Sequence, residues 1–383
     1  MMVKLSDVFD LQMGKTPSRN NNTYWNDGEY DWISISDLGN YEKYVSSTKE
    51  KITELAIKES GIKKVPSNTL IMSFKLSVGK TAITKDEVYT NEAIMAFIPN
   101  NKYDVYTDYF YHLFSGKDWS KDTNRAVMGA TLNKSTLGQI MIKIPPLEEQ
   151  RKVAETLDKV SNLIAKRKQQ LEKLDLLVKS KFVEMFGDET ENRWNCVLAE
   201  DVAQICVGVV IKPSQYYTDI NGIPAFRSLN IGYMTVKNTD WVYFTKEGYN
   251  KNTKSIIKEN DVLVIRSGAP GTACVATKEF DGYNAIDIII AHPNLKKVNS
   301  FYLAMFTNMP HGMNQIKGKI GGAAQQHFNV GAYKELLLML PPIELQNQFA
   351  DFVKQTEKTK TIINQSLEKL ETLKKALMQE YFG

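Results

Sequence analysis

The chain is poor in the residues that build covalent or metal crosslinks. Among its 383 residues are three cysteines and four histidines. Cys196, Cys206 and Cys274 are too few and too scattered for a disulfide framework, and the histidines do not fall at zinc-ligand spacings. We expect ordinary core or surface roles for all seven residues, and no metal site.

Long apolar runs are also missing. No stretch reaches the roughly 18 consecutive apolar residues that a membrane helix needs, and the N-terminal segment, with Lys4, Asp7 and Asp10, lacks the apolar core of a signal peptide. We therefore expect a cytoplasmic protein without a membrane partner.

The chain has little excess of either charge. It carries 48 Lys and Arg against 44 Asp and Glu, a net charge of +4. A protein that binds nucleic acid strongly by itself often has a clearly basic domain. If this chain binds DNA, part of the phosphate contact must come from a partner.

Catalytic motifs are absent as well. Gly79-Lys80-Thr81 and Gly14-Lys15-Thr16 each resemble the end of a phosphate-binding loop, but Phe74 and Phe9 stand where that motif needs its first glycine. No Asp or Glu is followed two positions later by Lys, and no Asn-Pro-Pro-Tyr, Gly-x-Ser-x-Gly or His-Glu-x-x-His run occurs. We expect no catalysis on this chain, and no cofactor or metal bound to it.

What the chain does contain is a repeat. The segment Ile144–Gly187 is written again, without gaps, as Leu340–Gly383. Both copies open on Pro-Pro-x-Glu-x-Gln and close on Phe-Gly, and Leu171-Glu172-Lys173-Leu174 matches Leu367-Glu368-Lys369-Leu370. The chain therefore repeats a long element after each of two other segments.

Each copy of the repeat has the start and stop signals of a helix. Two prolines precede it, acidic residues occupy its first turn, and a glycine follows its last apolar residue. Apolar residues recur at coiled-coil spacing, and the helix would span roughly 55–60 Å, too long to fold back on one small domain. A lone helix of this kind suits a solvated amphipathic helix or a homodimeric coiled coil. Duplication favours an intramolecular antiparallel pair related by a pseudo-twofold axis, acting as a spacer.

The segments before the two helices also resemble each other, though more loosely. Strand-like runs at Trp32–Ser36, Thr69–Phe74 and Ala93–Ile98 are followed by a helical run at Tyr106–Phe114 and a strand at Ile140–Ile144. Later segments repeat this order. We predict an α+β protein in which two α/β globules are separated by two long antiparallel helices, with domains at 1–143 (first globule), 144–187 (first helix), 188–339 (second globule) and 340–383 (second helix).

This order, with the two Pro-Pro-x-x-x-Gln helices, their terminal Phe-Gly and the run Gly14-Lys15-Thr16-Pro17-Ser18, resembles the specificity subunit of type I restriction-modification systems. The resemblance covers the whole chain. It implies that each globule is a target-recognition domain that reads one half of a split double-stranded DNA sequence, and that the helices fix the gap. The second globule departs from the pattern, because Gly208–Ser214 lacks the Thr-Pro-Ser run.

The resemblance further implies partners. Two methyltransferase subunits, which would carry S-adenosylmethionine, are expected to dock on the helices, and restriction or translocase subunits are further candidate partners. A rigid pair of helices would set the half-sites about one duplex turn apart, ~34 Å. The candidate spacer and docking residues are Pro145, Pro146, Glu148, Gln150, Leu171, Leu174, Pro341, Pro342, Glu344, Gln346, Leu367 and Leu370.

Candidate DNA contacts are polar or aromatic residues on predicted loops. They are Lys15, Ser18, Arg19, Ser36, Lys75, Lys80, Arg125 and Lys134 in the first globule, and Lys212, Tyr216, Tyr217, Arg227, Arg266, Lys317, Lys319, Gln325, Gln326 and His327 in the second. Arg can clamp guanine and Gln can clamp adenine, so Arg227 and the Gln325-Gln326 pair are of most interest. Any of these side chains can instead be a solvated surface group. Arg227 and Arg266 follow strand-like runs and can form internal salt bridges.

Two rival functions remain open at this point. A duplicated coiled-coil scaffold could bind protein ligands through its globules, and it would show no salt-dependent DNA affinity. An enzyme of unrecognised type would show methyl transfer or cleavage by the isolated chain.

Overall fold

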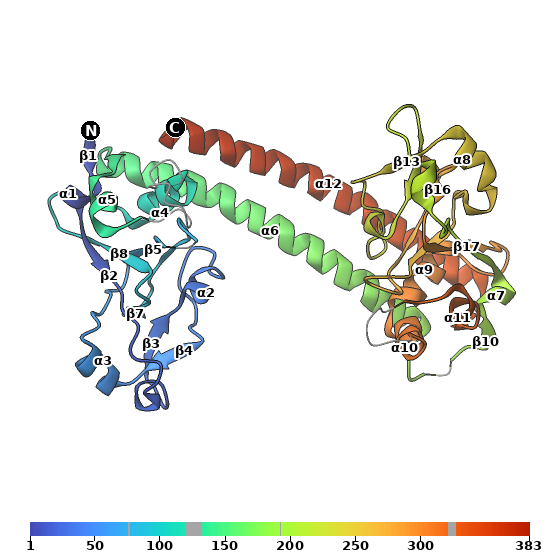
Figure 1. The fold of residues 1–383 in the computed structure, drawn as a ribbon, viewed down its shortest axis with the longest axis horizontal. Helices are drawn as coiled ribbons and strands as arrows, with labels where there is room; N and C mark the ends of the chain where they lie inside the picture. Colours follow the sequence, from blue (N-terminus) through green and yellow to red (C-terminus); the bar gives the residue numbers. More distant parts are fainter. Residues whose placement is uncertain (76, 120–131, 192, 321–326) are drawn as a thin grey trace. The chain divides into compact units, whose positions relative to one another are not determined.

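A computed structural model describes residues 1–75, 77–119, 132–191, 193–320 and 327–383. The chain divides into two compact units. Unit 1 comprises Met1–Arg167 and Ser366–Gly383, and unit 2 comprises Lys168–Gln365. Helix α6 (Leu147–Phe186) begins in unit 1 and ends in unit 2, whereas helix α12 (Ile343–Phe382) begins in unit 2 and ends in unit 1 (Figure 1). The predicted mixture of helices and strands is confirmed.

The ends of the long helices follow their sequence signals. Helix α6 starts directly after Pro145-Pro146 and carries Glu148 and Glu149 in its first turn. It ends before Gly187, whose φ of +93° is a conformation that suits glycine and whose N–H donates to the Val183 carbonyl at 2.8 Å. The same signals surround α12. None of the helices in the described ranges combines the length and apolarity needed to cross a membrane.

Unit 1 is built on a four-stranded antiparallel sheet in the order β2-β8-β5-β6. A smaller sheet places β3 between antiparallel β4 and parallel β7, and β1 pairs with β9. The strands are β1 (Met2–Lys4), β2 (Phe9–Met13), β3 (Tyr30–Ile33), β4 (Glu50–Ile52), β5 (Leu70–Ser73), β6 (Thr81–Ile83), β7 (Tyr89–Thr90), β8 (Ile94–Pro99) and β9 (Met141–Lys143). The helices are α1 (Leu5–Val8), η1 (Asn22–Tyr24), α2 (Ile35–Leu38), α3 (Glu54–Ser60), α4 (Thr107–Gly116) and α5 (Lys134–Gln139).

Unit 2 repeats this topology strand for strand. Its sheets have the orders β11-β17-β14-β15, β13-β12-β16 and β10-β18. The strands are β10 (Cys196–Leu198), β11 (Ala203–Val207), β12 (Ile223–Phe226), β13 (Val242–Phe244), β14 (Val262–Ile265), β15 (Ala273–Val275), β16 (Asn284–Ala285), β17 (Ile288–Pro293) and β18 (Leu337–Met339). The helices are α7 (Ala199–Val202), η3 (Pro213–Tyr216), η4 (Ser228–Asn230), α8 (Lys246–Lys251), η5 (Thr253–Ser255), η6 (Lys278–Phe280), α9 (Ser300–Asn308), α10 (Pro310–Gly318) and α11 (Val330–Lys334). The duplication seen in the sequence is therefore a duplication of fold.

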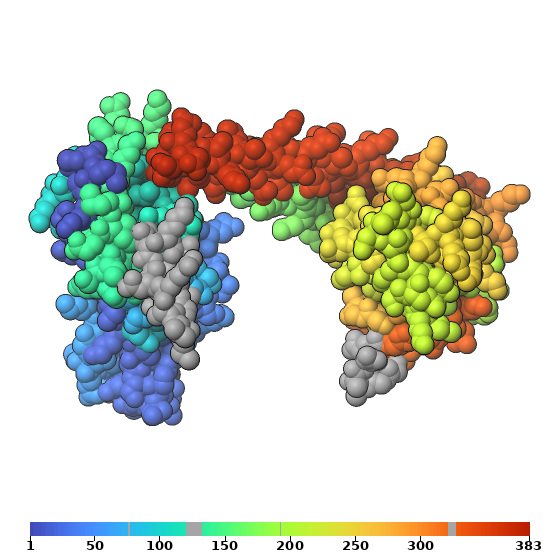
Figure 2. All heavy atoms as spheres, turned by 45° about the horizontal axis from the view of Figure 1, so that its top comes forward, coloured from blue at the N-terminus to red at the C-terminus, as the bar shows by residue number. Residues whose placement is uncertain are grey.

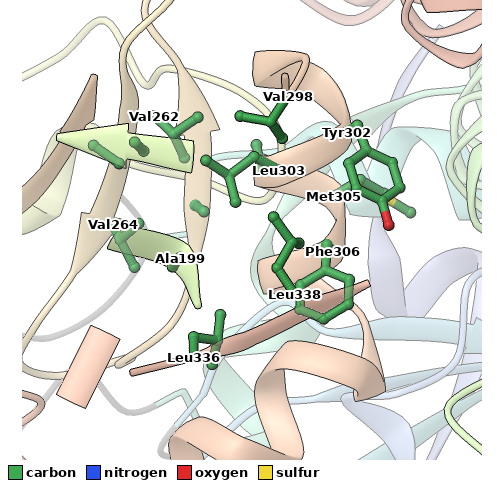
Figure 3. Packing of buried hydrophobic residues seen from close by; sticks show 14 of the residues in the cluster. Ala199, Val262, Val264, Val298, Tyr302, Leu303, Met305, Phe306, Leu336 and Leu338 are labelled. Carbon is green, nitrogen blue, oxygen red and sulfur yellow. The ribbon is translucent and has the colours of Figure 1, made fainter. Parts of the chain in front are cut away.

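The main core of unit 2 lies between its larger sheet and α9. Val262 and Val264 of β14 contribute one wall, and Leu303 and Phe306 of α9 the other (Figure 3). Both long helices enter this core. Phe182 of α6 lies with its ring centroid 5.4 Å from that of Phe349 in α12 and 5.6 Å from that of Tyr302 in α9.

The core of unit 1 is arranged in the same way. Val153 and Leu157 of α6 are buried in the cluster that covers the β2-β8-β5-β6 sheet. From the other end of the repeat, Phe382 of α12 packs with its ring 5.3 Å from Tyr109 of α4. The start of α6 and the end of α12 thus share one core, as antiparallel helices require.

Within unit 2 an ion pair joins the two long helices. Lys360 of α12 lies with Nζ 2.5 Å from Asp175 Oδ1 of α6 and 2.6 Å from Glu357 Oε1. Because Phe182 meets Phe349 and Asp175 meets Lys360, the helices run in opposite directions here. Lys360 stands at a position of α12 where coiled-coil spacing calls for an apolar residue. Its ion pairs with the Asp175 and Glu357 carboxylates explain how a lysine is accommodated there.

One predicted strand is wrong in extent. The alternation at Trp32–Ser36 favours a single strand, but β3 ends at Ile33 and α2 begins at Ile35. The Ser34 hydroxyl accepts a hydrogen bond from the Asp37 backbone N–H at 3.1 Å, and the Asp37 carboxylate accepts from the Ser34 N–H at 3.1 Å. This capping box starts a helical turn where period-two patterning continues.

Candidate nucleic-acid interface

The loop after β2 in unit 1 is fixed to the sheet by backbone hydrogen bonds. Gly14 N–H donates to Ile94 O at 3.1 Å, and Lys15 N–H donates to Thr90 O at 2.8 Å. A Cβ at Gly14 would lie 2.2 Å from Thr90 O, so this approach admits only glycine. The Lys15 side chain is exposed and its Nζ donates to the Ser60 carbonyl. The Gly-Lys-Thr run therefore serves a close strand–loop contact.

Arg19, on the same loop, is held by aromatic rings and a carboxylate. Its guanidinium carbon lies 3.8 Å from the Trp25 ring centroid and 4.9 Å from that of Trp32. Two nitrogens reach the two Glu50 carboxylate oxygens, and 47% of the Arg19 side chain remains exposed. A guanidinium fixed in this way has lost much of its rotamer freedom, which lowers the entropic cost of binding an acceptor.

This part of unit 1 is an end of the unit. Figure 1 places β3, β4 and α3 away from the unit 1 part of α6, and the largest group of dark blue atoms in Figure 2, from the start of the chain, forms that end. Ser18 is exposed here, and its carbonyl accepts from Trp25 Nε1 at 3.1 Å. Lys15, Ser18 and Arg19 are therefore brought together on one loop.

Ser36, Lys75 and Lys80 form a second group in unit 1. Ser36 is exposed on α2, and the other two lie on the loop between β5 and β6. A Cβ at Gly39, which follows α2, would lie 2.5 Å from Lys80 Nζ, so α2 and that loop are in contact. Lys75 is half-buried with Nζ 5.3 Å from the Phe74 ring centroid, which makes Lys80 the more accessible of the two lysines.

Lys134 and Arg125 were predicted in the segment before α6. Lys134 is exposed at the first position of α5 and lines a surface depression that also includes Gln12 and Lys63. Arg125 lies outside the described residues.

In unit 2, the loop after β11 presents Lys212, Tyr216 and Tyr217. Lys212 is exposed and has a φ of +44°. Tyr216 packs closely on Gly248, where a Cβ would lie 2.6 Å from the Tyr216 Cβ. Tyr217 keeps 39% of its surface exposed. Of the two tyrosines, Tyr217 is the one available for stacking.

Arg227 is only partly free. Its Nη2 donates to the Asp240 carbonyl, and its buried Nε has no partner within the described part of the chain. The backbone N–H of Arg227 donates to Asn230 Oδ1 at 2.9 Å, in a turn that corresponds to the Ser34–Asp37 turn of unit 1. Arg227 is therefore half-buried and partly engaged within unit 2.

Arg266 is directed inward, so its predicted DNA contact needs correction. Nη1 lies 2.6 Å from Asp287 Oδ1, Nε donates to Phe328 O at 3.2 Å, and only 9% of the side chain is exposed. Its Nη2 lies 2.6 Å from His327 Nε2. The guanidinium is occupied in the internal role that the sequence left open, and it is not available to a base in this conformation.

His327 and the lysines of unit 2 differ in their freedom. His327 is exposed, but both nitrogens of its ring are in contact with protein groups: Nε2 with Arg266, and Nδ1 with Ser267 Oγ at 2.8 Å. Lys317 is exposed at the end of α10, whereas Lys319 is paired with Glu335 at 3.0 Å. The predicted Gln325 and Gln326 lie outside the described residues.

The glutamines that recur in the two helix repeats have the same buried role. Gln150 Nε2 donates to Asp104 O at 2.9 Å and to Pro145 O at 3.0 Å, and its Oε1 accepts from Tyr106 N–H at 2.9 Å. Gln346 makes the equivalent three bonds in unit 2, to Lys297 O, Pro341 O and Asn299 N–H. Neither glutamine side chain is exposed, so of the two roles predicted for them, spacer and docking, the contacts favour the first: each glutamine anchors a long helix on its globule.

The other predicted spacer residues fall into three classes. Pro145 and Pro341 are buried, Leu171, Leu174, Leu367 and Leu370 are half-buried, and Pro146, Glu148, Pro342 and Glu344 are exposed. Only the four exposed residues have side chains that are largely accessible to another protein.

A charged cluster that the sequence did not reveal also joins α6 to unit 1. Lys43 Nζ lies 2.5 Å from Asp108 Oδ1 and 2.7 Å from Asp158 Oδ2, and His112 Nε2 lies 2.8 Å from Asp158 Oδ1. Burial acts to raise the pKa of Asp158, but the hydrogen bonds from His112 and Lys43 outweigh it and lower that pKa. These residues are far apart in sequence, which explains why no local pattern indicated them.

The sequence also missed Glu50 and Asp287 as residues that position an arginine. Both are single acidic residues far along the chain from Arg19 and Arg266. The pair Trp25 and Trp32 was the usable signal, because tryptophan rings close to an arginine favour stacking with its guanidinium.

These features agree with a comparison against protein families. Residues 1–174 and 194–372 each match the family described as the type I restriction modification DNA specificity domain. The chain belongs to this family. The two matched segments divide the chain as the duplicated sheets do, one specificity domain with each helix.

Individual proteins that are similar in sequence to this chain include specificity subunits. The MjaIX specificity subunit of Methanocaldococcus jannaschii is 25% identical over 376 residues, which cover 91% of this chain and 85% of that protein. The EcoR124I/EcoR124II specificity subunit of Escherichia coli is 30% identical over 168 residues, 42% of this chain and 40% of that protein.

Solved structures show the same fold. The type I restriction-modification S subunit from M. genitalium superposes with a TM-score of 0.60 at 12% identity, covering 100% of this chain and 96% of that one. A chain from a structural study of complex assembly in the type I R-M system has a TM-score of 0.62 at 17% identity, covering 100% and 97%. Specificity-family architecture therefore extends over the whole chain.

Proposed function

We propose that this chain is the DNA-reading subunit of a type I restriction-modification complex, and that each globule reads one half of a bipartite target. Family membership and the strand-for-strand duplication of two specificity domains carry the proposal. One chain with two such domains can contact two half-sites, and the unlike loops after β2 and β11 give each half its own sequence.

The helices are the proposed spacer. Gln150 and Gln346 each tie the start of a long helix to its globule through three buried hydrogen bonds. At the other ends, Phe182 and Phe186 of α6 lie in the core of unit 2, and Phe382 of α12 packs on the core of unit 1. A junction of this kind resists bending, because any reorientation leaves buried polar groups unpaired. Rigid junctions are what a fixed gap between half-sites requires.

Methyl transfer and cleavage are assigned to partner subunits. Two methyltransferase subunits carrying S-adenosylmethionine are the proposed partners, and the exposed Pro146, Glu148, Pro342 and Glu344 are candidate contacts for them. The small net charge of +4 supports shared DNA binding, since partner subunits would add phosphate contacts.

Within unit 1, the Arg19 loop is the proposed base-reading element. Its guanidinium is stacked, half-exposed and paired with Glu50, so binding to guanine requires that Glu50 share or release it. Lys15 and Lys80 are proposed phosphate contacts. In unit 2, the exposed Lys212, Tyr217 and Lys317 are the proposed contacts, together with the half-buried Arg227.

The direct experiment is to purify the chain with its methyltransferase subunit and methylate a randomised DNA library. The proposal predicts a consensus of two short half-sites with a constant gap. Methylation without a bipartite consensus would refute it. A complex whose association with DNA does not weaken as salt rises would instead support a protein-binding scaffold.

A further inference from the structure

A cluster of titratable side chains in unit 2 includes none of the proposed DNA contacts. Cys206 of β11 lies with Sγ 3.7 Å from Nε2 of His292 in β17, and His292 Nδ1 lies 2.7 Å from Asp261 Oδ1. The three side chains therefore form a chain of contacts from thiol to imidazole to carboxylate. Among the described residues, no group of His, Cys, Asp and Glu side chains is arranged to hold a metal ion.

The sheet register explains why these residues meet. Gln204 is the direct partner of His292 across the β11–β17 pair, so Cys206, two residues further, is a diagonal neighbour on the same face. Val262 pairs with Ala291 in the β14–β17 pair. Asp261 and His292 are the next residues outward from that pair, which brings the carboxylate beside the imidazole.

The carboxylate fixes the imidazole. Only 3% of the Asp261 side chain is exposed, and its second oxygen accepts the Lys258 N–H at 2.7 Å. Because Nδ1 of His292 faces Asp261, it carries a proton, and Nε2 is directed at the sulfur. The hydrogen bond to Asp261, followed by the contact with Cys206, raises the pKa of His292 to about 9. At neutral pH the ring is therefore a cation beside the sulfur.

The sulfur has two possible neighbours, one for each protonation state. As a thiol, Cys206 donates to the Lys254 carbonyl at 3.3 Å. As a thiolate, it is stabilised by the His292 cation, as in other cysteines that lie beside a protonated histidine. The charged groups on the elements around the sulfur are His292, Asp261 and Lys254, whose side chain is exposed. The His292 cation favours the thiolate, and Asp261 orients His292.

We propose that Cys206 is a nucleophilic modification site, a thiol activated by the His292–Asp261 pair that reacts with soft electrophiles such as low-molecular-mass disulfides. The thiolate sulfur attacks one sulfur of the disulfide, a new S–S bond forms and the old S–S bond breaks. The proton that the Cys206 thiol released to water on ionising is taken up from water by the departing thiolate. Electrons balance without an added oxidant, because the reagent disulfide is exchanged for a mixed disulfide.

The chain supplies its own controls. Cys196 is exposed and its nearest polar contact is the Trp194 carbonyl at 3.9 Å. Cys274 is buried, and burial raises its pKa to about 12. The three cysteines thus represent an activated, an ordinary and an inaccessible thiol in one protein.

The test is alkylation by iodoacetamide at pH 6.5 in the full-length chain, followed for each cysteine by peptide mass spectrometry. We expect Cys206 to react about fivefold faster than Cys196, because a cationic imidazole lies beside its sulfur. Cys274 should stay unmodified in the folded protein.

Two variants separate activation from structure. His292→Gln should lower the alkylation rate of Cys206 about fivefold and leave the rate of Cys196 unchanged, and Asp261→Asn should lower the Cys206 rate part of the way. Circular dichroism and the unreactive Cys274 report whether each variant is folded. If wild-type Cys206 reacts no faster than Cys196, or if folded His292→Gln leaves the Cys206 rate in place, the proposal is wrong.

Discussion

The side chain of Gln150 accepts a hydrogen bond from the backbone N–H of Tyr106 at 2.9 Å, where α6 begins in unit 1. Its amide group also donates to two carbonyls of the same unit. Because Gln346 repeats this arrangement in unit 2, one residue type fixes the start of both long helices. The glutamine of the Pro-Pro-x-x-x-Gln motif is thus explained by the junction that it makes.

Replacing this glutamine should loosen the junction. Gln150→Leu leaves one N–H and two carbonyls unpaired in a buried site, and we expect a loss of about 2–4 kcal/mol in the free energy of unfolding of unit 1. Amide exchange at Tyr106 should accelerate. Glu148→Ala, on the exposed side of the same turn, is the matched control and should change stability by less than about 0.5 kcal/mol. Equal exchange rates in the two variants would show that the buried amide does not hold the helix.

The Asp158 cluster predicts a loss of stability in acid. Hydrogen bonds from His112 and Lys43 overcome burial and lower the pKa of Asp158 below its unfolded value. A depressed carboxyl pKa contributes stability that is present above the unfolded pKa, about 3.9, and lost as pH falls through the folded value. We expect Asp158→Asn to cost about 2 kcal/mol at pH 7 and less as the pH is lowered below 4.

Thermal unfolding of wild type and Asp158→Asn between pH 3 and pH 7 measures this difference. The melting temperatures should converge at the acid end. A gap between the two proteins that stays constant with pH would mean that the charge of Asp158 contributes nothing to stability.

Arg19 should contribute more to DNA recognition than its charge alone. We expect Arg19→Ala to weaken binding of the assembled complex to its target about tenfold or more, because a guanidinium that contacts a base contributes about 1–3 kcal/mol. Lys102→Ala removes the same charge from another exposed loop of unit 1 and should weaken specific and non-specific DNA equally. Glu50→Gln should strengthen binding, since it releases Arg19 from its ion pair. Equal effects of Arg19→Ala and Lys102→Ala on both DNAs would exclude base reading by Arg19.

Arg266 should matter for stability. Arg266→Ala removes the three contacts of a nearly buried guanidinium, with Asp287, Phe328 and His327. We expect this variant to lose about 2–4 kcal/mol in unfolding free energy. Asp287→Asn keeps the acceptor oxygen and suits the φ of +47° at this position, so it should cost less. Lys317→Ala, on the exposed end of α10, should be neutral. Urea unfolding of the three variants tests this order, and an Arg266→Ala protein as stable as Lys317→Ala would contradict it.

Much of the fold could be predicted because its signals are local. Pro145-Pro146 and Gly187 mark the ends of α6 by backbone geometry alone, and the internal repeat carried this prediction to α12. Strand β3 was placed too long because Ser34 interrupts an alternating pattern by capping a turn, which periodicity does not report.

The candidate site was harder to predict for a physical reason. Whether Arg19 is presented outward and Arg266 inward depends on Glu50 and Asp287, which the fold brings from distant positions. Both arginines follow polar or strand-like runs and look alike in sequence. Gln150 was likewise predicted only as a spacer or docking residue, because an exposed and a buried glutamine cannot be told apart without the loop that covers it.

The most direct test of the central claim is to lengthen the spacer. One heptad is inserted into both α6 and α12, near Arg167 and near Ile363, and the methylation consensus of the assembled complex is mapped on a randomised DNA library. We expect both half-sites to be unchanged and the gap between them to increase. An altered half-site, or an unchanged gap in an active complex, would contradict the division of labour between reading globules and measuring helices.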